Sequence, residues 1–133
     1  YVVDQVIKLT ERFDQPKVTV LGLAYKGNVS DYRESPSLEV VELLMKEGLD
    51  VSIYDPHIMH TMDHKEESFP EAIKHAHCLI VLCDHDEFKQ LDFNLVFNHM
   101  SYPLVFDTKN CISSEETGDK VVLVNYGNLH EFI

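Results

Sequence analysis

The chain has 133 residues, of which 44% are hydrophobic and 26% charged, a composition typical of one soluble globular domain. Its net charge of −12 comes from 23 acidic and 11 basic residues, and the basic residues do not cluster, which argues against nucleic acid and anionic membranes as partners. No apolar run approaches the ~20 residues of a membrane span, and the charged first segment is unlike a signal peptide, so we expect a cytoplasmic protein.

Residues 1–15 form the first predicted element. Val2, Val6, Leu9 and Phe13 recur at helical spacing, which indicates an amphipathic helix that ends before Pro16. The helix begins without a capping residue, so we expect the sequence to be part of a longer chain. The resemblance described below implies that 1–15 is the end of an interdomain helix, followed by a domain over 16–133.

The next elements are a strand, a long loop and a helix. Val18 to Leu21 reads as the strand, and the loop runs to Ser35, which is predicted to cap a helix from Pro36 to Glu47. Gly48 stands where a helix-terminating glycine belongs. Val51 to Tyr54 is the second predicted strand.

The middle of the chain is expected to hold short helices around one buried strand. His57 to Ser68 is polar and aperiodic and is predicted to be a loop, with a short helix at 70–76. The apolar run from Cys78 to Cys83 fits a strand buried on both faces. Asp86 and Asp92 are predicted N-caps of two short helices. The second of these helices should turn four apolar side chains inward: Phe93, Val96, Phe97 and Met100.

Residues 103–107 and 121–125 complete the set as a fourth and a fifth strand. Strands that alternate with helices predict an α/β fold, a Rossmann-like three-layer sandwich with a mostly parallel sheet of about five strands and helices on both faces. Gly22 and Gly27 do not form the G-x-G-x-x-G fingerprint, so the sequence does not predict a primary dinucleotide site.

The loop between the first strand and the helix at Pro36 is the predicted functional site. It carries two cations, Lys26 and Arg33, in an otherwise acidic chain. Ligands of doubly wound sheets bind beyond the carboxyl ends of the strands, which is where this loop begins. An anionic ligand is therefore expected, held by these local charges.

The loop also belongs to a longer pattern. It reads G-L-A-Y-K-G-N-V-S-D-Y-R-E-S-P at 22–36 and is followed by Y-D-P at 54–56, C-D-H-D-E-F-K at 83–89 and F-D-T-K-N at 106–110. Together these motifs resemble the UDP-glucose/GDP-mannose dehydrogenase family, within it the C-terminal UDP-binding domain. The form N-V-S-D-Y-R-E-S-P is more similar to members that oxidise UDP-N-acetylhexosamines, UDP-N-acetylmannosamine among them.

The resemblance implies roles for individual residues. The aromatic residue and Lys at the positions of Tyr25 and Lys26 contact the UDP-sugar, and Arg33 would reach the NAD that the N-terminal domain binds, with Asp31 orienting it. Lys109 stands where the family usually has an Arg that touches the nucleotide. A Lys keeps the charge but loses the bidentate fork, so Lys109 as a ligand and Lys109 as a surface lysine both stay open.

The resemblance further implies an NAD-dependent 6-dehydrogenase that oxidises the C6 alcohol of a UDP-sugar to a uronate in two hydride transfers. The family's catalytic cysteine lies in a G-G-x-C motif that this sequence lacks, so no catalytic residue is assigned here and the chain alone is expected to be inactive. Its expected partners are the UDP-sugar, the N-terminal NAD-binding domain and, for the full-length enzyme, further copies of itself. The alternative is a stand-alone nucleotide-binding or regulatory module without redox chemistry.

Three further groups of residues have both a structural and a functional interpretation. Asp55 precedes Pro56 and is predicted to form a turn rather than to bind a ribose. A segment rich in histidine is predicted to be a solvated loop rather than a metal site: His57, His60, Asp63 and His64. The three cysteines lack C-x-x-C spacing and are predicted to be free thiols, two of them packed within a strand: Cys78, Cys83 and Cys111.

Overall fold

Five parallel strands form the centre of the protein, as the alternating pattern predicts. The computed structural model describes residues 2–24, 27–28, 31–33, 35–59 and 61–133. The strands are β1 (Lys17–Leu21), β2 (Asp50–Tyr54), β3 (Cys78–Val81), β4 (Leu104–Asp107) and β5 (Val122–Val124). The helices are α1 (Val2–Thr10), α2 (Pro36–Lys46), α3 (Phe69–Ile73), α4 (Phe93–His99) and α5 (Ser114–Thr117), with 3₁₀ turns η1 (Asp86–Gln90) and η2 (Leu129–Glu131).

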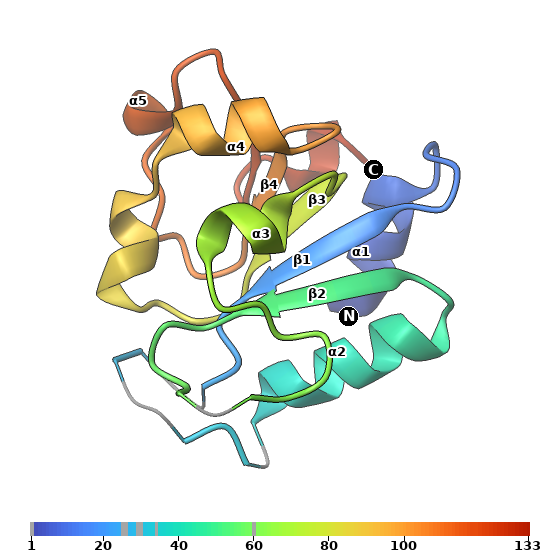
Figure 1. Ribbon diagram of the computed structural model, residues 1–133. Helices are drawn as coiled ribbons and strands as arrows, with labels where there is room; N and C mark the ends of the chain where they lie inside the picture. The colour runs from blue at the N-terminus through green and yellow to red at the C-terminus, as the bar shows by residue number, and fades with distance from the viewer. Residues whose placement is uncertain (1, 25–26, 29–30, 34, 60) are drawn as a thin grey trace.

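The sheet has the strand order β2-β1-β3-β4-β5, so the chain runs outward from β1 to one edge and then returns across it to the other. Helices α1 and α2 pack together on one face of the sheet, and α3 and α4 pack together on the other (Figure 1). This is the predicted Rossmann-like three-layer sandwich. In a sheet of this order, the direction of winding reverses between β1 and β3, and ligands bind beyond the strand ends at that point.

The core lies where the sheet meets its two helix layers. Every residue of β3 and β4 is buried, which confirms that these strands are covered on both faces. The first helix is shorter than expected, because it ends at Thr10 rather than Asp14. Phe13 nevertheless packs its ring against His77 and Tyr102, with centroids 4.9 and 5.2 Å apart.

Most of the predicted helix ends are confirmed. The Ser35 hydroxyl accepts the N–H of Ser37 at the start of α2, and Gly48 follows its end with φ +88°. The Asp92 carboxylate accepts two N–H groups at the start of α4. These caps form locally, from residues a few positions apart, which is why sequence spacing predicts them.

Two predictions about the middle of the chain are wrong. Asp86 is the first residue of η1 and not its cap, because its N–H donates to Oδ1 of Asn28, which supplies the partner from another loop. Phe97 is 55% exposed, because Phe93, Val96 and Met100 already fill the buried side of α4. One full side of this helix therefore faces away from the sheet.

The polar segment 57–68 is a loop for most of its length, as predicted, but it also approaches the outer side of β2. Ile53 of β2 accepts the N–H of Glu66 and donates its own N–H to the carbonyl of His64, both at 2.8 Å. These bonds form an isolated parallel bridge between Ile53 and Lys65. The Lys65 side chain is only 2% exposed and pairs with Glu67 at 3.2 Å.

The cysteines give a direct test of the buried strand. Cys78 and Cys83 are buried as predicted, but the strand ends at Val81, so Cys83 follows it rather than lying within it. Burial raises the pKa of the Cys78 thiol to about 12, and a reagent cannot reach it, so we expect a thiol reagent at pH 8 to leave Cys78 unlabelled in the folded chain. The pKa of Cys111 is raised as well, but its half-buried side chain is accessible, so mass spectrometry of partly labelled protein should find Cys111 modified first. Fast labelling of Cys78 in native buffer would contradict the burial of β3.

Candidate nucleotide site at the strand ends

Three loops meet beyond the carboxyl ends of the central strands: residues 22–35 after β1, 82–85 after β3 and 108–113 after β4. Because these strands are parallel neighbours, their loops gather at one edge of the sheet, beside the point where the winding reverses. The structure therefore brings the predicted loop after β1 next to the segment after β3, and the segment after β4 follows on the other side of β3.

Two glycines let the loop after β1 lie directly on the end of β3. A Cβ atom on Gly22, whose φ is +95°, would stand 2.3 Å from Cβ of Cys83. A Cβ atom on Gly27 would stand 2.2 Å from Oδ1 of Asp84. At Gly22 the overlap is with Cβ and backbone atoms of Cys83 and the φ is positive, so the close approach requires glycine there. At Gly27 the nearest atom is the end of the Asp84 side chain, which can move aside, and the backbone oxygen of Asp84 at 3.0 Å leaves little further room.

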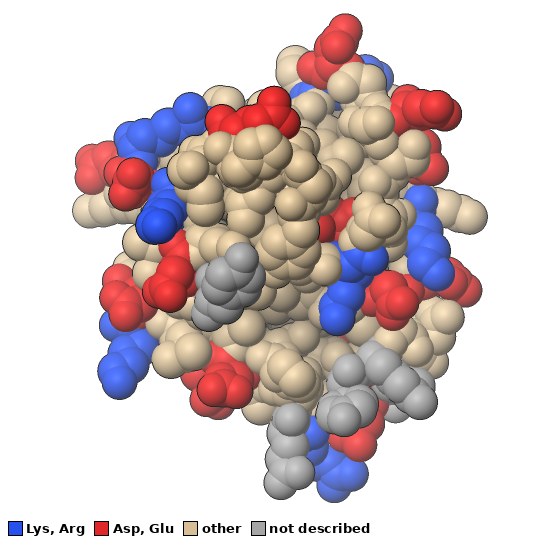
Figure 2. All heavy atoms as spheres, turned by 180° about the vertical axis from the view of Figure 1, so that it is seen from behind, with Lys and Arg blue, Asp and Glu red and all other residues tan. Residues whose placement is uncertain are grey.

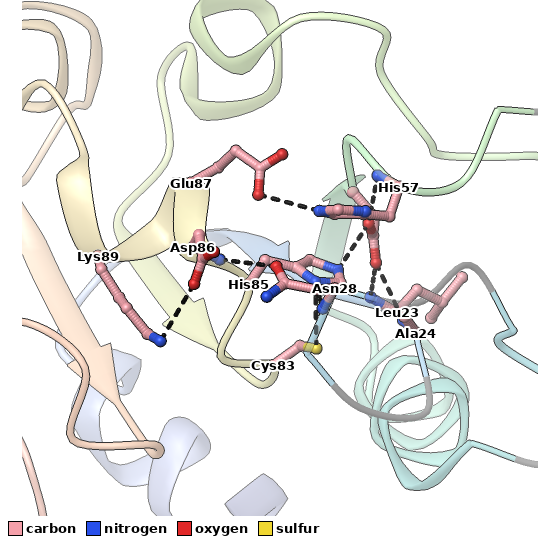
Figure 3. A network of polar contacts seen from close by, with 10 residues as sticks. Leu23, Ala24, Asn28, His57, Cys83, His85, Asp86, Glu87 and Lys89 are labelled. Carbon is pink, nitrogen blue, oxygen red and sulfur yellow. Dashed lines mark hydrogen bonds and ion pairs between the residues drawn. The ribbon is translucent and has the colours of Figure 1, made fainter.

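Asp55 holds the start of the same loop from the end of β2. Its Oδ2 accepts the N–H groups of Leu23 and Ala24 at 2.8 and 3.0 Å, and its Oδ1 accepts the N–H of His57 at 2.9 Å (Figure 3). Burial alone would raise the pKa of Asp55, but the contacts with His85 and with these N–H groups lower it. The predicted turn at Asp55 is confirmed, and the carboxylate also anchors the loop after β1.

His85 is the second buried polar group of this network. Its Nε2 lies 2.9 Å from Oδ1 of Asp55, without the alignment of a good hydrogen bond, so the contact is mainly electrostatic. Its Nδ1 accepts the N–H of Asn28 at 2.7 Å and lies 3.8 Å from Sγ of Cys83. His57 covers the ring, with centroids 4.2 Å apart. The imidazole thus connects the loops after β1, β2 and β3 (Figure 3).

Asp107 organises the loop after β4 in the way that Asp55 organises its own. It is buried at the end of the strand, where Oδ1 accepts the N–H of Lys109 at 3.0 Å and Oδ2 accepts that of Ile112 at 2.8 Å. Burial, together with the nearby Asp107 charge, raises the pKa of the Cys111 thiol to about 12. The Asp107 turn fixes the backbone from which the Lys109 side chain extends.

A cavity of about 520 Å³ lies beside this turn. Lys89, which follows β3, and Lys109, which follows β4, both line it, as do Asp84, Asn110, Cys111, Ile112, Ser113 and Glu116. Lys109 is exposed, and Lys89 also pairs with Asp86 at 3.3 Å. Two ammonium groups on one cavity offer a binding place for an anionic group such as a diphosphate.

The other predicted site residues are distributed differently. Tyr25 and Lys26 lie outside the described residues. Arg33 is exposed, and its Nε lies 3.4 Å from Oδ1 of Asp31, the residue expected to orient it. An exposed pair of this kind contributes at most about 1 kcal/mol to stability, so the Arg33 guanidinium can exchange Asp31 for a ligand at small cost.

The distribution of charge on the surface means that an anionic ligand needs cations close to its binding site. On the face drawn in Figure 2, the Lys and Arg side chains stand apart from one another, with Asp and Glu side chains among them. An anionic ligand therefore meets a protein whose overall field repels it. Binding has to depend on the few cations of the strand-end loops.

The histidine-rich segment takes a structural role where it is described. His57 bonds Glu87 at 2.9 Å and covers His85, and His64 adopts a positive φ of 69° in the loop. His60 lies outside the described residues. Within the part of the chain that the structure describes, no three His, Cys, Asp or Glu residues gather as a metal site requires.

Sequence reasoning missed His85, Asp107 and Lys89 as parts of this region. Asp107 had a usable signal, since it ends a buried strand just as Asp55 follows one. Lys89 and His85 lie in the C-D-H-D-E-F-K motif, but no local pattern says that this motif meets the loop after β1. The partners Asn28 and His85 are 57 positions apart, so only the fold brings them together.

Comparisons with known proteins agree with this arrangement. A family model described as the UDP binding domain of the UDP-glucose/GDP-mannose dehydrogenase family matches residues 19–114. A UDP-N-acetyl-D-mannosamine dehydrogenase of Methanococcus vannielii is 37% identical over 120 residues, which are 86% of this chain and 28% of the relative. The UDP-glucose 6-dehydrogenase 3 of Oryza sativa is 32% identical, over 75% of this chain and 27% of the relative.

A solved structure gives the same relation. The native structure of the UDP-N-acetyl-mannosamine dehydrogenase of Staphylococcus aureus superposes with a TM-score of 0.89 at 41% identity, over 99% of this chain and 31% of that one. The chain therefore spans less than a third of the proteins it matches. Among its described residues, no helix is long and apolar enough to cross a membrane.

Proposed function

Since the chain belongs to the UDP-glucose/GDP-mannose dehydrogenase family through the UDP binding domain, we propose that it is the UDP-sugar-binding part of an NAD-dependent nucleotide-sugar 6-dehydrogenase. The observation that carries the proposal is the cavity at the carboxyl ends of β3 and β4, lined by Lys89 and Lys109. We propose UDP-N-acetylmannosamine or a related UDP-N-acetylhexosamine as the substrate, on the strength of the mannosamine dehydrogenases among the relatives.

The residues of the chain would serve this function by binding and orientation. Lys109 supplies a positive charge for the diphosphate from a turn that Asp107 holds in place. Tyr25 and Lys26 are proposed as further contacts of the UDP-sugar, and Arg33 as a contact of the cofactor. The Lys109 ammonium replaces the family's guanidinium, so it would hold phosphate as a point charge without a bidentate fork.

NAD, when bound, accepts the hydride from C6 of the sugar. The described residues of this chain would contribute only a small part of the NAD-binding site. The sequence lacks a G-x-G-x-x-G loop, and Arg33 is the one cation assigned to the cofactor. The Arg33 side chain is 83% exposed, so it is free to reach a group held by another domain. We propose that the main NAD site lies in an N-terminal domain of the same enzyme.

The helix α1 is proposed to be the end of an interdomain helix, with residues 16–133 forming the UDP-binding domain. A cavity of about 780 Å³ lies between α1 and the C-terminal segment, away from the strand-end loops. Gln5 of α1 lines it, and its buried Oε1 has no hydrogen-bond partner among the described residues. The cavity supports a further part of the protein packing on this side, whereas the Gln5 oxygen is already buried within this chain and out of reach of an outside partner.

The full-length enzyme is proposed to be a cytoplasmic homo-oligomer that supplies uronate precursors for polysaccharides. UDP-sugars and NAD are metabolites of the cytoplasm, which supports that location. The alternative of a stand-alone regulatory module is not favoured, because the relatives described above are dehydrogenases.

The test is calorimetric titration of the chain with UDP, with GDP and NAD as comparison ligands. We expect UDP to bind, GDP and NAD to bind much more weakly, and the chain alone to form no NADH from a UDP-sugar. Equal binding of GDP and UDP, or no binding of UDP, would contradict the proposal.

Lys109→Ala should weaken UDP binding about tenfold, the lower end of the range for a charge-assisted hydrogen bond, because the side chain is exposed to solvent. The matched control is Lys46→Ala, which removes an equally exposed lysine from the last turn of α2 and should leave the affinity unchanged. Titration of both variants at two salt concentrations measures the effect. Equal affinities for the two variants would make Lys109 an ordinary surface lysine.

A further inference from the structure

The proposed function gives no role to His85, although its imidazole is fully buried beneath the loop after β1. Nδ1 of the ring accepts the N–H of Asn28, a residue of that loop, at 2.7 Å. Oδ1 of Asn28 in turn accepts the N–H of Asp86 at 3.0 Å. Asn28, whose φ is +60°, is therefore fastened at two points to the segment after β3 (Figure 3).

The protonation of the ring follows from these contacts. A backbone N–H can donate only to an unprotonated nitrogen, so Nδ1 carries no proton when it holds Asn28. The single proton of the neutral ring is then on Nε2, which faces Asp55. If Nδ1 gains a proton, it faces the Asn28 N–H as a second donor, and its remaining neighbour is Sγ of Cys83, 3.8 Å away.

We propose that His85 is a positioning residue that holds the loop after β1 in its ligand-binding arrangement through an unprotonated Nδ1 and releases Asn28 when that nitrogen is protonated. In the sequence, Asn28 stands two positions after Lys26 and five before Arg33, so we expect its release to weaken the ligand contacts proposed for these cations. The effect on ligand affinity rests on the proposed function, whereas the effect on Asn28 does not.

The groups around the ring decide the pH at which release occurs. Asp55 and His57 face it from the loop after β2 and Cys83 from the loop after β3, while Glu87 of η1 pairs with His57. Burial alone would lower the pKa of His85, but the contacts with Asp55 and Cys83 raise it to about 9. The Asn28 N–H acts against this rise, because it favours the neutral ring.

The loop and the whole fold should therefore respond to pH in opposite directions. The raised pKa of His85 stabilises the fold fully below its ordinary value of 6.5, and this contribution is lost as the pH rises towards 9. The bond to Asn28 forms over the same window as the pH rises. If His85 were only structural, the protection of the Asn28 amide and the global stability would fall together as the pH rises.

Two substitutions of His85 separate the effect of its Nδ1 contact from the effect of its Nε2 contact. His85→Asn places an amide oxygen near the position of Nδ1, where it can accept the Asn28 N–H at any pH, but it does not reach Asp55. His85→Gln reaches Asp55 with its amide and leaves Asn28 without an acceptor. Each variant is the control for the other, since both replace the imidazole with a neutral amide.

The experiment follows the Asn28 amide by NMR between pH 6 and 9, without ligand, in the wild-type chain and both variants. We expect the protection factor of this amide to rise with pH in the wild type, to stay high in His85→Asn and to be lost in His85→Gln. A wild-type amide that is insensitive to pH, or one equally protected in His85→Gln, would overturn the proposal.

The same proteins are then unfolded with urea and titrated with UDP. His85→Gln should be the more stable variant and yet bind UDP about five- to tenfold more weakly than His85→Asn, the range expected for one hydrogen bond. Affinity that follows stability instead would make His85 structural. If none of the three proteins binds UDP, the proposed function fails, and the Asn28 amide still decides the role of His85.

Discussion

Gly22→Ala is expected to lower the free energy of unfolding by about 2–5 kcal/mol, because it adds a methyl group at a strained backbone position and against a buried neighbour. The φ of +95° disfavours an L-residue by about 1–2 kcal/mol, and the new Cβ would stand 2.3 Å from Cβ of Cys83. Cys83 follows the end of β3 and is itself buried, so relief of this overlap adds about 1–3 kcal/mol.

Gly48→Ala is the matched control for this prediction. Gly48 has nearly the same backbone, with φ +88°, but a Cβ atom there has no neighbour within 4 Å. Urea unfolding of both variants therefore separates the cost of the backbone angle, which they share, from the cost of the contact with Cys83. Equal losses of stability would mean that the loop after β1 does not press on β3.

Asp55→Asn is expected to cost about 3–4 kcal/mol of stability, because it leaves a buried network without its charge. The carboxylate accepts three N–H groups and faces His85. In Asn, one of the two oxygens becomes an NH₂ group, which is a donor and cannot accept a hydrogen bond from these N–H donors. Removal of one member of a buried ion pair commonly costs about this much. Asp63→Asn, in the exposed part of the loop after β2, changes the same atoms and should cost almost nothing.

The pH dependence gives this prediction a second measurement. The folded-state pKa of Asp55 is lowered, so its contribution is present above the ordinary value of 3.8 and is lost as the pH falls through the folded-state pKa. Acid titration of stability should therefore be steeper in the wild type and in Asp63→Asn than in Asp55→Asn. Identical acid profiles in the three proteins would show that Asp55 is not ionised in the fold.

The fold could be predicted from the sequence because its signals are local. Apolar runs give the strands, Ser35 and Asp92 cap helices within a few residues, and Gly48 ends α2 through its own backbone. The order of the strands has no such signal. Asp86 illustrates the limit, because a cap that spacing assigns to its own side chain is replaced by a partner from Asn28, 58 positions away.

From the sequence, only those residues of the candidate site could be predicted whose charge suggests that they bind a ligand. Lys26 and Arg33 are the cations that the sequence singles out, and Lys109 is added by the resemblance. Of these three, the structure describes Arg33 and Lys109, which both lie in loops after strands. The residues that hold those loops in place are buried, and their structural role depends on contacts between the ends of different strands. The sequence predicts a turn at Asp55 and assigns no role to His85. The partners of both residues lie far away in the sequence, and only the sheet brings them together.

The bridge between Ile53 and Lys65 also determines how the sheet meets other chains. An outer strand with free N–H and C=O groups is a template for strand addition and aggregation. In β2, Ile53 has both backbone groups occupied by residues 64 and 66, and the buried side chain of Lys65 lies at that border. The opposite border is β5, which has only three residues. A chain that added a strand to this sheet would therefore find part of β2 already bonded on one side and a short template on the other.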